Sequence, residues 1–401
     1  MKKMLIVGIT MSAAGTENSF LNFVNHIDYS EWSVDLLLAK REGEWLDRIP
    51  ENINVYDMGE DGDLFTLSKD NSNKIINEFY QKRPFNIFKL FPTLFSIAVS
   101  KGNKKTYAKN KLWIKMMREM PRFENEYDLA IGYWGDRTLF YVVDKVNAKH
   151  KMAWMHFMFP SPPRSPKTYK KYIDKLDKFV AVSQECSDSI IRAIPAVKDK
   201  VVVFENYIDE NRVKDLAKGD CPFEKSGFDI VTVGRINYDK GYDVALPAVA
   251  DFLKEHKEAK WHIVGSGKGS YFNDFISAVN QSGVKDRIVV HGVQSNPYIY
   301  IMNADLYFQP SRNESQCMVV DEAKVLCKPI LVTDYPTAKR QLENGNLGRI
   351  CNFNTKEIYN TLNELYINKS LREQYSKRLS DLEKTSENKK STKELLSFSS
   401  I

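Results

Sequence analysis

The segment 305–334 constrains the fold more than any other part of the chain. It opens with an apolar run, 306–309, bounded by Pro310, and this pattern predicts a buried parallel strand. A polar turn follows, and the sequence then predicts a helix over 318–326 and a second strand over 330–333. The segment is therefore a βαβ unit. In open α/β sheets, ligands bind at the strand-to-helix end of such units.

Two carboxylates border this turn: Glu314 lies before the predicted helix and Glu322 in its first turns. A carboxylate is a good acceptor for sugar hydroxyls. The N–H groups at the helix start (Cys317, Met318 and Val319) have no intrahelical partner and favour a diphosphate. Both glutamates can therefore border one bound ligand. The alternative is two solvated carboxylates on an ordinary βαβ loop.

A second strand-to-helix turn carries two cations. The run 234–241, Gly-Arg-Ile-Asn-Tyr-Asp-Lys-Gly, follows a strand predicted at 229–233. Arg235 offers a planar fork and Lys240 a compact charge, and glycines frame both, which suits a diphosphate. Two solvated charges are the alternative. The pairing of this turn with two glutamates about 80 residues later favours the diphosphate site.

The N-terminal half also alternates strands and helices. A strand predicted at 5–10 leads into a loop with Gly15 and Thr16, where backbone can approach a phosphate. The loop lacks Gly-x-Gly-x-x-Gly, so a dinucleotide site is not supported. His156 directly follows a strand predicted at 151–155, at the ligand end of a parallel sheet. A helix-capping loop and a structural histidine are the alternatives.

These motifs resemble the retaining GT-B glycosyltransferases of family 4, the glycosyl transferases group 1. The resemblance rests on the Glu-x7-Glu spacing of Glu314 and Glu322, the run Lys-Pro-Ile-Leu-Val-Thr-Asp at 328–334 and the Gly-Arg-(x)n-Lys-Gly element at 234–241. Weaker matches are the loop 14–17, His156 after its strand, Val-Gly-x-Gly at 264–267 and His-Gly-Val at 291–293. The family usually has Gly-Phe after the first glutamate, where this chain has 315–317, Ser-Gln-Cys.

The resemblance implies an α/β fold of class GT-B, with two Rossmann-like domains facing each other across an interdomain cleft. Composition and pattern place the N-terminal domain at 1–205, and the resemblance implies that it is the acceptor-side domain. A polar, irregular stretch at 206–228 is expected as the hinge. The C-terminal, nucleotide-sugar-binding domain is expected at 229–383, and a Ser/Lys-rich, frayed tail at 384–401.

The resemblance also implies roles for the site residues. Arg235, Lys240 and the helix-start amides hold the donor diphosphate, and Val293 follows the strand-end glycine near the nucleotide base. Glu322 holds the ribose, and Glu314 and His156 the donor sugar. Neither a cofactor nor a metal is required, because the cations stabilise the charge that grows on the leaving group.

The implied function is retaining transfer of a hexose or hexosamine to a hydroxyl, in surface polysaccharide or glycolipid assembly. UDP-sugars are the favoured donors, GDP-sugars are a further option, and the acceptor is a glycan or lipid-linked saccharide. One rival is an epimerase of the same fold, for which no acid/base carboxylates are identifiable in both domains. Another is a non-catalytic GT-B-like subunit that binds glycan or chaperones a partner transferase, which the altered 315–317 loop keeps open.

The stretch 82–118 is strongly basic and contains no Asp or Glu. Its cations are Lys82, Arg83, Lys89, Lys101, Lys104, Lys105, Lys109, Lys111, Lys115 and Arg118, interleaved with Phe85, Phe88, Phe91, Phe95, Tyr107 and Trp113. This pattern favours contact with an anionic membrane surface over nucleic acid. The alternative is a pair of core-facing helices with a solvated basic face.

Bulk composition excludes other classes. A chain of 401 residues with 43% hydrophobic and 27% charged residues is globular. Five scattered cysteines without a Cys-x-x-Cys pair suggest neither a disulfide framework nor a zinc site. The apolar run 4–11 is too short for a membrane span, so we expect a cytoplasmic protein, peripheral on the cytoplasmic face of the membrane. The Asp-x-Asp at 61–63 is expected to be a turn rather than a metal site.

Overall fold

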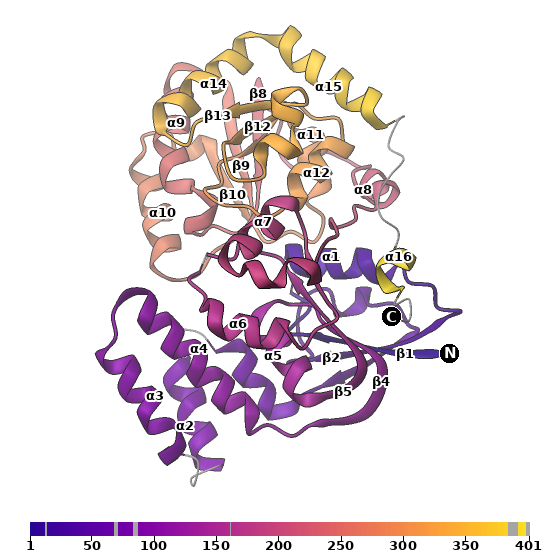
Figure 1. The fold of residues 1–401 in the computed structure, drawn as a ribbon. Coiled ribbons are helices and arrows are strands. Elements are labelled where there is room, and N and C mark those ends of the chain that lie inside the picture. The colour runs from indigo at the N-terminus through magenta and orange to yellow at the C-terminus, as the bar shows by residue number, and fades with distance from the viewer. Residues whose placement is uncertain (13, 68–70, 83–86, 161, 384–391, 398–401) are drawn as a thin grey trace. The chain divides into compact units, whose positions relative to one another are not determined.

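A computed structural model describes residues 1–12, 14–67, 71–82, 87–160, 162–383 and 392–397. The chain forms two compact units, each built on its own parallel sheet (Figure 1). Unit 1 comprises Met1–Asn206 together with Lys390–Ile401, and unit 2 comprises Tyr207–Lys389. Two α/β units with parallel sheets were the prediction from the alternating pattern, and this prediction is confirmed.

The sheet of unit 1 has seven parallel strands in the order β3-β2-β1-β4-β5-β6-β7. Residues 4–7 of β1, an interior strand, are completely buried, because helices cover both faces of a parallel sheet. The strands are β1 (Lys2–Gly8), β2 (Trp32–Leu38), β3 (Ile53–Asp57), β4 (Phe123–Gly132), β5 (Val146–Met155), β6 (Lys178–Ala181) and β7 (Val201–Val203).

Ser165 and Ser183 each cap a helix of unit 1 by accepting a hydrogen bond from a backbone N–H group of its first turn. The helices are α1 (Gly15–Val24), α2 (Ser72–Lys82), α3 (Ile87–Val99), α4 (Gly102–Arg118), α5 (Asp136–Lys145), α6 (Pro166–Ile173), α7 (Gln184–Ala193) and α16 (Thr392–Leu396).

The sheet of unit 2 has six parallel strands in the order β10-β9-β8-β11-β12-β13. They are β8 (Phe228–Val233), β9 (Ala259–Val264), β10 (Ile288–Gly292), β11 (Leu306–Gln309), β12 (Ile330–Thr333) and β13 (Arg349–Cys351). The chain order reverses between the paired strands β8 and β11. Ligands of such sheets bind at the carboxyl ends of the strands beside this reversal.

Helices cover both faces of this second sheet, and a buried apolar cluster fills the space on either side. The helices are α8 (Glu210–Leu216), α9 (Tyr242–Glu255), α10 (Gly269–Gln281), α11 (Tyr298–Asn303), α12 (Met318–Val325), α13 (Ala338–Gln341), α14 (Thr355–Ile367) and α15 (Lys369–Glu383). In the part of the chain that the structure describes, no helix combines the length and apolarity needed to cross a membrane.

Three local expectations need correction. Helix α1 begins at Gly15, so Gly15 and Thr16 lie in its first turn and not in a longer loop. The stretch expected as an irregular hinge contains α8, which Asp209 caps through its side chain and which Val213 anchors in the core of unit 2. Of the tail expected to be frayed, only residues 392–397 are described, and they contain α16; the rest of 384–401 lies outside the described residues. In both segments a few buried apolar side chains outweigh a polar composition.

The last helix returns to unit 1. Leu395 and Leu396 of α16 are 4% and 6% exposed. The Lys178 ammonium group donates hydrogen bonds to the carbonyl oxygens of Leu395 (2.7 Å) and Ser397 (2.8 Å). An ion pair of 3.2 Å joins Lys393 to Glu31. These contacts attach the C-terminal helix to the sheet and to the turn before β2.

We expect Leu395→Ala to lower the free energy of unfolding of unit 1 by about 2 kcal/mol, because a buried leucine is truncated. Five of the six tryptophans lie in unit 1, so tryptophan fluorescence in urea reports on this unit. Val99→Ala is the matched control, since Val99 is 61% exposed, and its effect should stay within about 0.5 kcal/mol. Equal effects of the two substitutions would contradict the docking of α16.

Candidate functional site

Two loops of unit 2 meet where β8 and β11 end. The loop 234–241 follows β8, and the loop 310–317 follows β11. Gly241 has a left-handed backbone (φ +68°), and a Cβ there would lie 2.0 Å from the Pro310 carbonyl oxygen. Only glycine permits this approach. The predicted cation turn and the predicted carboxylate turn are therefore in direct contact.

An ion pair connects the two loops. Lys240 Nζ lies 2.6 Å from Glu314 Oε1, and the two side chains are 20% and 11% exposed. Burial lowers the pKa of Lys240, but the charge and hydrogen bond of Glu314 outweigh burial, so the pKa lies above its usual value. The structure thus brings two predicted site residues together, each neutralising the other.

A chain of hydrogen bonds holds the Glu314 carboxylate from behind. Tyr307 donates to Gln309 (2.5 Å), Gln309 donates to the Ser311 hydroxyl (2.8 Å), and Ser311 donates to Glu314 Oε1 (2.6 Å). Thr333 on β12 donates to the Ser311 carbonyl (2.6 Å). Buried polar groups of this kind fix the geometry because every partner is satisfied. Sequence reasoning missed this network; a glutamine at the end of an otherwise apolar strand was its signal.

Arg235 is the second cation of the site. Its charge acts to lower the pKa of Lys240, so the two positive groups are close enough to repel each other. Arg235 is exposed, and none of the residues that the structure describes forms a hydrogen bond or ion pair with its guanidinium group. An anion that contacts Arg235 and Lys240 together would relieve this repulsion.

The start of α12 differs in part from the prediction. The Cys317 N–H donates to the side-chain oxygen of Gln341 (3.3 Å), and the Gln341 amide group donates back to the Cys317 carbonyl (3.1 Å). The expectation that the Cys317 amide is unpaired is therefore wrong, because a side chain from α13 caps it. The N–H groups of Met318 and Val319 belong to the first helical turn, which forms no intrahelical bonds through its amides.

Glu322 lies in α12 and is 4% exposed. The Tyr298 hydroxyl donates a hydrogen bond of 3.1 Å to its carboxylate. Burial, followed by the charges of neighbouring groups that include Glu322 and Glu314, raises the pKa of Tyr307 well above its usual value. The charges of Glu314 and Glu322 therefore both act on the buried hydroxyl group of Tyr307.

Arg312 joins the same two loops from the solvent side. Its guanidinium group donates to both carboxylate oxygens of Asp243, one bond measuring 2.7 Å, and to the Tyr238 carbonyl (2.5 Å). Its carbon Cζ lies 3.9 Å from the centre of the Tyr238 ring, and its backbone N–H donates to the Asp239 carbonyl (2.8 Å). Sequence reasoning missed Arg312, since its partners lie about 70 residues earlier.

Further loops approach this edge of the sheet. A Cβ on Gly265, after β9, would lie 2.0 Å from the Gly234 carbonyl oxygen, so the two turns pack backbone to backbone. The Gly265 N–H donates to the carbonyl of Gly292, the last residue of β10 (2.8 Å). Val293 follows and is 56% exposed. The predicted base-side residue is thus adjacent to the loop network and available for contact.

The remaining predicted residues belong to unit 1. His156 directly follows β5, at the carboxyl end of its strand, and burial lowers the pKa of His156 to about 4. The imidazole is therefore neutral near pH 7. Gly15 and Thr16 open α1, and the next residue, Glu17, is buried and accepts a hydrogen bond from Trp134 (3.2 Å). These three predicted residues belong to unit 1, whereas Lys240 and Glu314 belong to unit 2.

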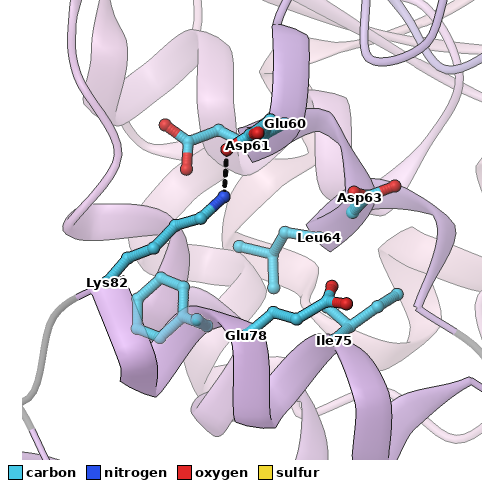
Figure 2. Close-up of a pocket in the computed structure, with 8 residues that line it drawn as sticks. Glu60, Asp61, Asp63, Leu64, Ile75, Glu78 and Lys82 are labelled. Atoms are coloured by element: carbon cyan, nitrogen blue, oxygen red, sulfur yellow. Dashed lines mark hydrogen bonds and ion pairs between the residues drawn. The ribbon is translucent and has the colours of Figure 1, made fainter.

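The Asp-x-Asp at 61–63 lies in a 3₁₀ turn, Gly59–Thr66, as predicted. Figure 2 shows it beside a small pocket, with Lys82 bonded to Glu60. A second lysine, Lys40, pairs with Asp63 at 2.7 Å. Throughout the described residues, no group of three or more His, Cys, Asp or Glu is arranged to hold a metal ion.

Comparison with known proteins agrees with this geometry. Residues 214–380 match the family model described as "Glycosyl transferases group 1". This match covers less than half of the chain and lies within unit 2. It includes the Lys240 and Glu314 loops and both predicted carboxylates, so the site described above lies within the matched residues.

Relatives are distant. The chain is 25% identical over 166 residues to an alpha-D-kanosaminyltransferase of Streptomyces kanamyceticus. The aligned region covers 40% of this chain and 42% of that protein. The chain thus spans less than half of that relative. An uncharacterized glycosyltransferase of Haemophilus influenzae is 24% identical over 354 residues, covering 86% and 84% of the two chains.

The fold is that of GT-B glycosyltransferases. A solved structure of Anabaena HepE in complex with UDP and glucose superposes with a TM-score of 0.66 at 14% identity. The superposition covers 95% of this chain and 94% of HepE. The GT-B architecture inferred from the sequence motifs is confirmed at this level.

We expect the Arg312–Asp243 contact to couple the two loops of the site. In a double-mutant cycle with Arg312→Ala and Asp243→Ala, the coupling free energy should be about 1 kcal/mol, because the bond is bidentate and partly shielded. The control pair is Lys254–Asp251, which is exposed on both sides, and its coupling should be below about 0.5 kcal/mol. Urea unfolding measures both, and additive effects at Arg312 would contradict the coupling.

We expect His156 to make unit 1 less stable in acid. Because its folded pKa is about 4 and its unfolded pKa about 6.5, only the unfolded chain binds the proton between these values. Stability is therefore lost as pH falls through this window, by about 3 kcal/mol relative to His156→Gln. The measurement is urea unfolding from pH 7 to pH 4, with His26→Gln as the exposed control. Parallel pH profiles for wild type and His156→Gln would contradict this.

Proposed function

We propose that this protein is a retaining glycosyltransferase that moves a hexose or hexosamine from a nucleotide-sugar to a hydroxyl group. The observation that carries the proposal is the Lys240–Glu314 ion pair beside the exposed Arg235, at the carboxyl ends of β8 and β11. This arrangement offers two cations for a diphosphate and an oriented carboxylate for a sugar. The match to the glycosyl transferases group 1 model includes these residues, which supports the proposal.

When the donor binds, Lys240 and Glu314 separate, and each takes a group of the donor as its new partner. A diphosphate takes the Lys240 ammonium and the Arg235 guanidinium, together with the N–H groups of Met318 and Val319. The Glu314 carboxylate then accepts hydrogen bonds from the donor sugar, while Ser311 keeps it in place. Glu322 accepts from the ribose hydroxyls.

The cations act most strongly in the transition state. As the bond from the anomeric carbon to the phosphate oxygen breaks, negative charge grows on the leaving diphosphate, and Arg235 and Lys240 stabilise that charge. This is the role a divalent cation has in metal-dependent transferases, so the proposed reaction needs no metal. The neutral imidazole of His156 contributes a hydrogen bond to the sugar.

Retention of the anomeric configuration follows from the family resemblance. A carboxylate that accepts hydrogen bonds from Ser311 and from the hydroxyl groups of the donor sugar is a weak nucleophile, which argues against Glu314 forming a covalent intermediate. Front-face attack fits this site better: the acceptor oxygen bonds to the anomeric carbon while the leaving phosphate oxygen takes its proton.

A UDP-sugar is the favoured donor, because the superposed HepE was solved with UDP and glucose. A GDP-sugar is the second option. The acceptor is a glycan or a lipid-linked saccharide of surface polysaccharide or glycolipid assembly, and we place the protein in the cytoplasm at the inner face of the membrane. The strongly basic stretch 82–118 supports this placement.

The proposal predicts slow nucleotide release from one donor of a UDP-, GDP- and ADP-sugar panel, with EDTA present. Lys240→Met should reduce this rate at least about 100-fold, because transition-state charge loses a partner. Glu322→Ala should weaken donor binding, with Glu322→Gln intermediate, since an amide still bonds a ribose hydroxyl. Glu224→Gln, which is exposed, is the control for each rate.

Failure of every donor to bind would favour a non-catalytic GT-B-like subunit, for which the unusual Ser315-Gln316-Cys317 run is the sequence feature. Loss of release in EDTA with recovery on adding Mg²⁺ would contradict the metal-free site. Isothermal titration of each donor, beside the release assay, separates these two outcomes.

A further inference from the structure

Helix α3 turns its apolar face to solvent. Phe88 is 82% exposed, Phe91 68%, and Phe95 and Val99 are each 61% exposed. Their spacing of three and four residues places all four side chains along one side of the helix. We refer to these four residues as the α3 apolar face. No other helix in the described part of the chain exposes phenylalanine in this way.

The opposite side of α3 packs on α4. Leu90 and Thr93 are 2% and 4% exposed, and Leu94 and Ile97 on the same side are partly buried. Helix α3 is therefore apolar on both sides, whereas a surface helix of a globular protein is polar on its outer side. The exposed phenylalanines indicate a surface that is covered by something other than unit 1. Figure 1 shows α3 at the outer margin of unit 1, beside α4.

Lysines lie on the helix that packs against α3. Helix α4 begins three residues after Val99, and the run 101–111 carries the exposed side chains Lys101, Lys104, Lys105, Lys109 and Lys111. The second half of α4 is part of the core: Trp113 is buried and donates a hydrogen bond to the Leu64 carbonyl (2.8 Å). The buried C-terminal half of α4 thus fixes the position of the lysine-rich N-terminal half. Arg83, Phe85 and the Lys89 side chain lie outside the described residues.

The two helices of the basic stretch 82–118 therefore differ. Helix α4 agrees with the alternative interpretation of this stretch, a core-facing helix with a solvated basic side. Helix α3 does not, because its phenylalanines are exposed. An apolar face beside a group of lysines, in a stretch without Asp or Glu, matches the interfacial region of an anionic bilayer.

We propose that the α3 apolar face inserts into the headgroup region of an anionic lipid bilayer while the α4 lysines contact lipid phosphates. A second copy of the chain is a poorer occupant, since a symmetric contact through α3 would bring two sets of like charges together. This inference deepens the proposed function, because it brings a lipid-linked acceptor to the enzyme. It acts through residues that are separate from the donor site of unit 2.

The test is co-sedimentation of the full chain with vesicles of equimolar phosphatidylglycerol and phosphatidylcholine, and with phosphatidylcholine alone. Wild type should bind the anionic vesicles. Phe91→Ser/Phe95→Ser and Lys104→Glu/Lys105→Glu should each weaken binding by about tenfold or more. Binding should also fall with added salt, since the lysine contribution is screened.

Matched controls come from unit 2: Ile367→Ser removes an exposed apolar side chain, and Lys257→Glu/Lys285→Glu reverses two exposed charges. Neither should change vesicle binding. No binding by wild type, or equal binding by the α3 double variant, overturns the proposal. So does a concentration-dependent dimer in sedimentation velocity that the Phe91→Ser/Phe95→Ser variant abolishes, because it assigns the face to a second copy.

Donor hydrolysis in the absence of vesicles separates this inference from the proposed function. The α3 and α4 variants should release nucleotide at the wild-type rate, because none of the substituted residues belongs to the donor site. Vesicle binding without any donor hydrolysis supports the docking surface and contradicts the transferase. Donor hydrolysis without vesicle binding supports the transferase and contradicts the docking surface.

Discussion

The parallel pairing of β8 with β11 is the constraint on which the candidate site depends. These strands are far apart in sequence. The sheet continues from β8 through β9 and β10 on one side, and from β11 through β12 and β13 on the other. The carboxyl ends of β8 and β11 therefore carry two loops that have no strand between them. Gly241 allows the loops to touch, and the Lys240–Glu314 and Arg312–Asp243 contacts join them on two sides. A diphosphate site needs cations from one loop and helix amides from the other, and this pairing supplies both.

Sequence reasoning performs best where a local pattern determines the structure. The strands at 306–309 and 330–333 are found with the predicted bounds, because short apolar runs between turn residues are unambiguous in a parallel sheet. The approach of Lys240 to Glu314 was also predictable, since each residue follows a strand and parallel strands end at one edge. Spacing alone, however, did not show that the two side chains bond to each other.

The features that sequence reasoning missed depend on contacts between distant residues. Gln341 caps the Cys317 amide from another helix, and Arg312 reaches back to Asp243; neither has a local signal. Helix α16 was hidden in a Ser/Lys-rich tail, because two leucines suffice to attach a short helix. In 82–118, composition does not show which aromatic residues are buried. Trp113 enters the core and Phe88 does not, although both lie in basic, apolar surroundings.

The Lys240–Glu314 ion pair also bears on the end of the proposed reaction cycle. While a complete donor is bound, sugar hydroxyls satisfy Glu314 and phosphate oxygens satisfy Lys240. Once the sugar has left, the nucleotide diphosphate still holds Lys240, but Glu314 has lost its partner in a partly buried position. Lys240 can then pair either with the nucleotide diphosphate or with the Glu314 carboxylate. The carboxylate thus acts as a built-in competitor of the product and favours its departure over that of the unreacted donor.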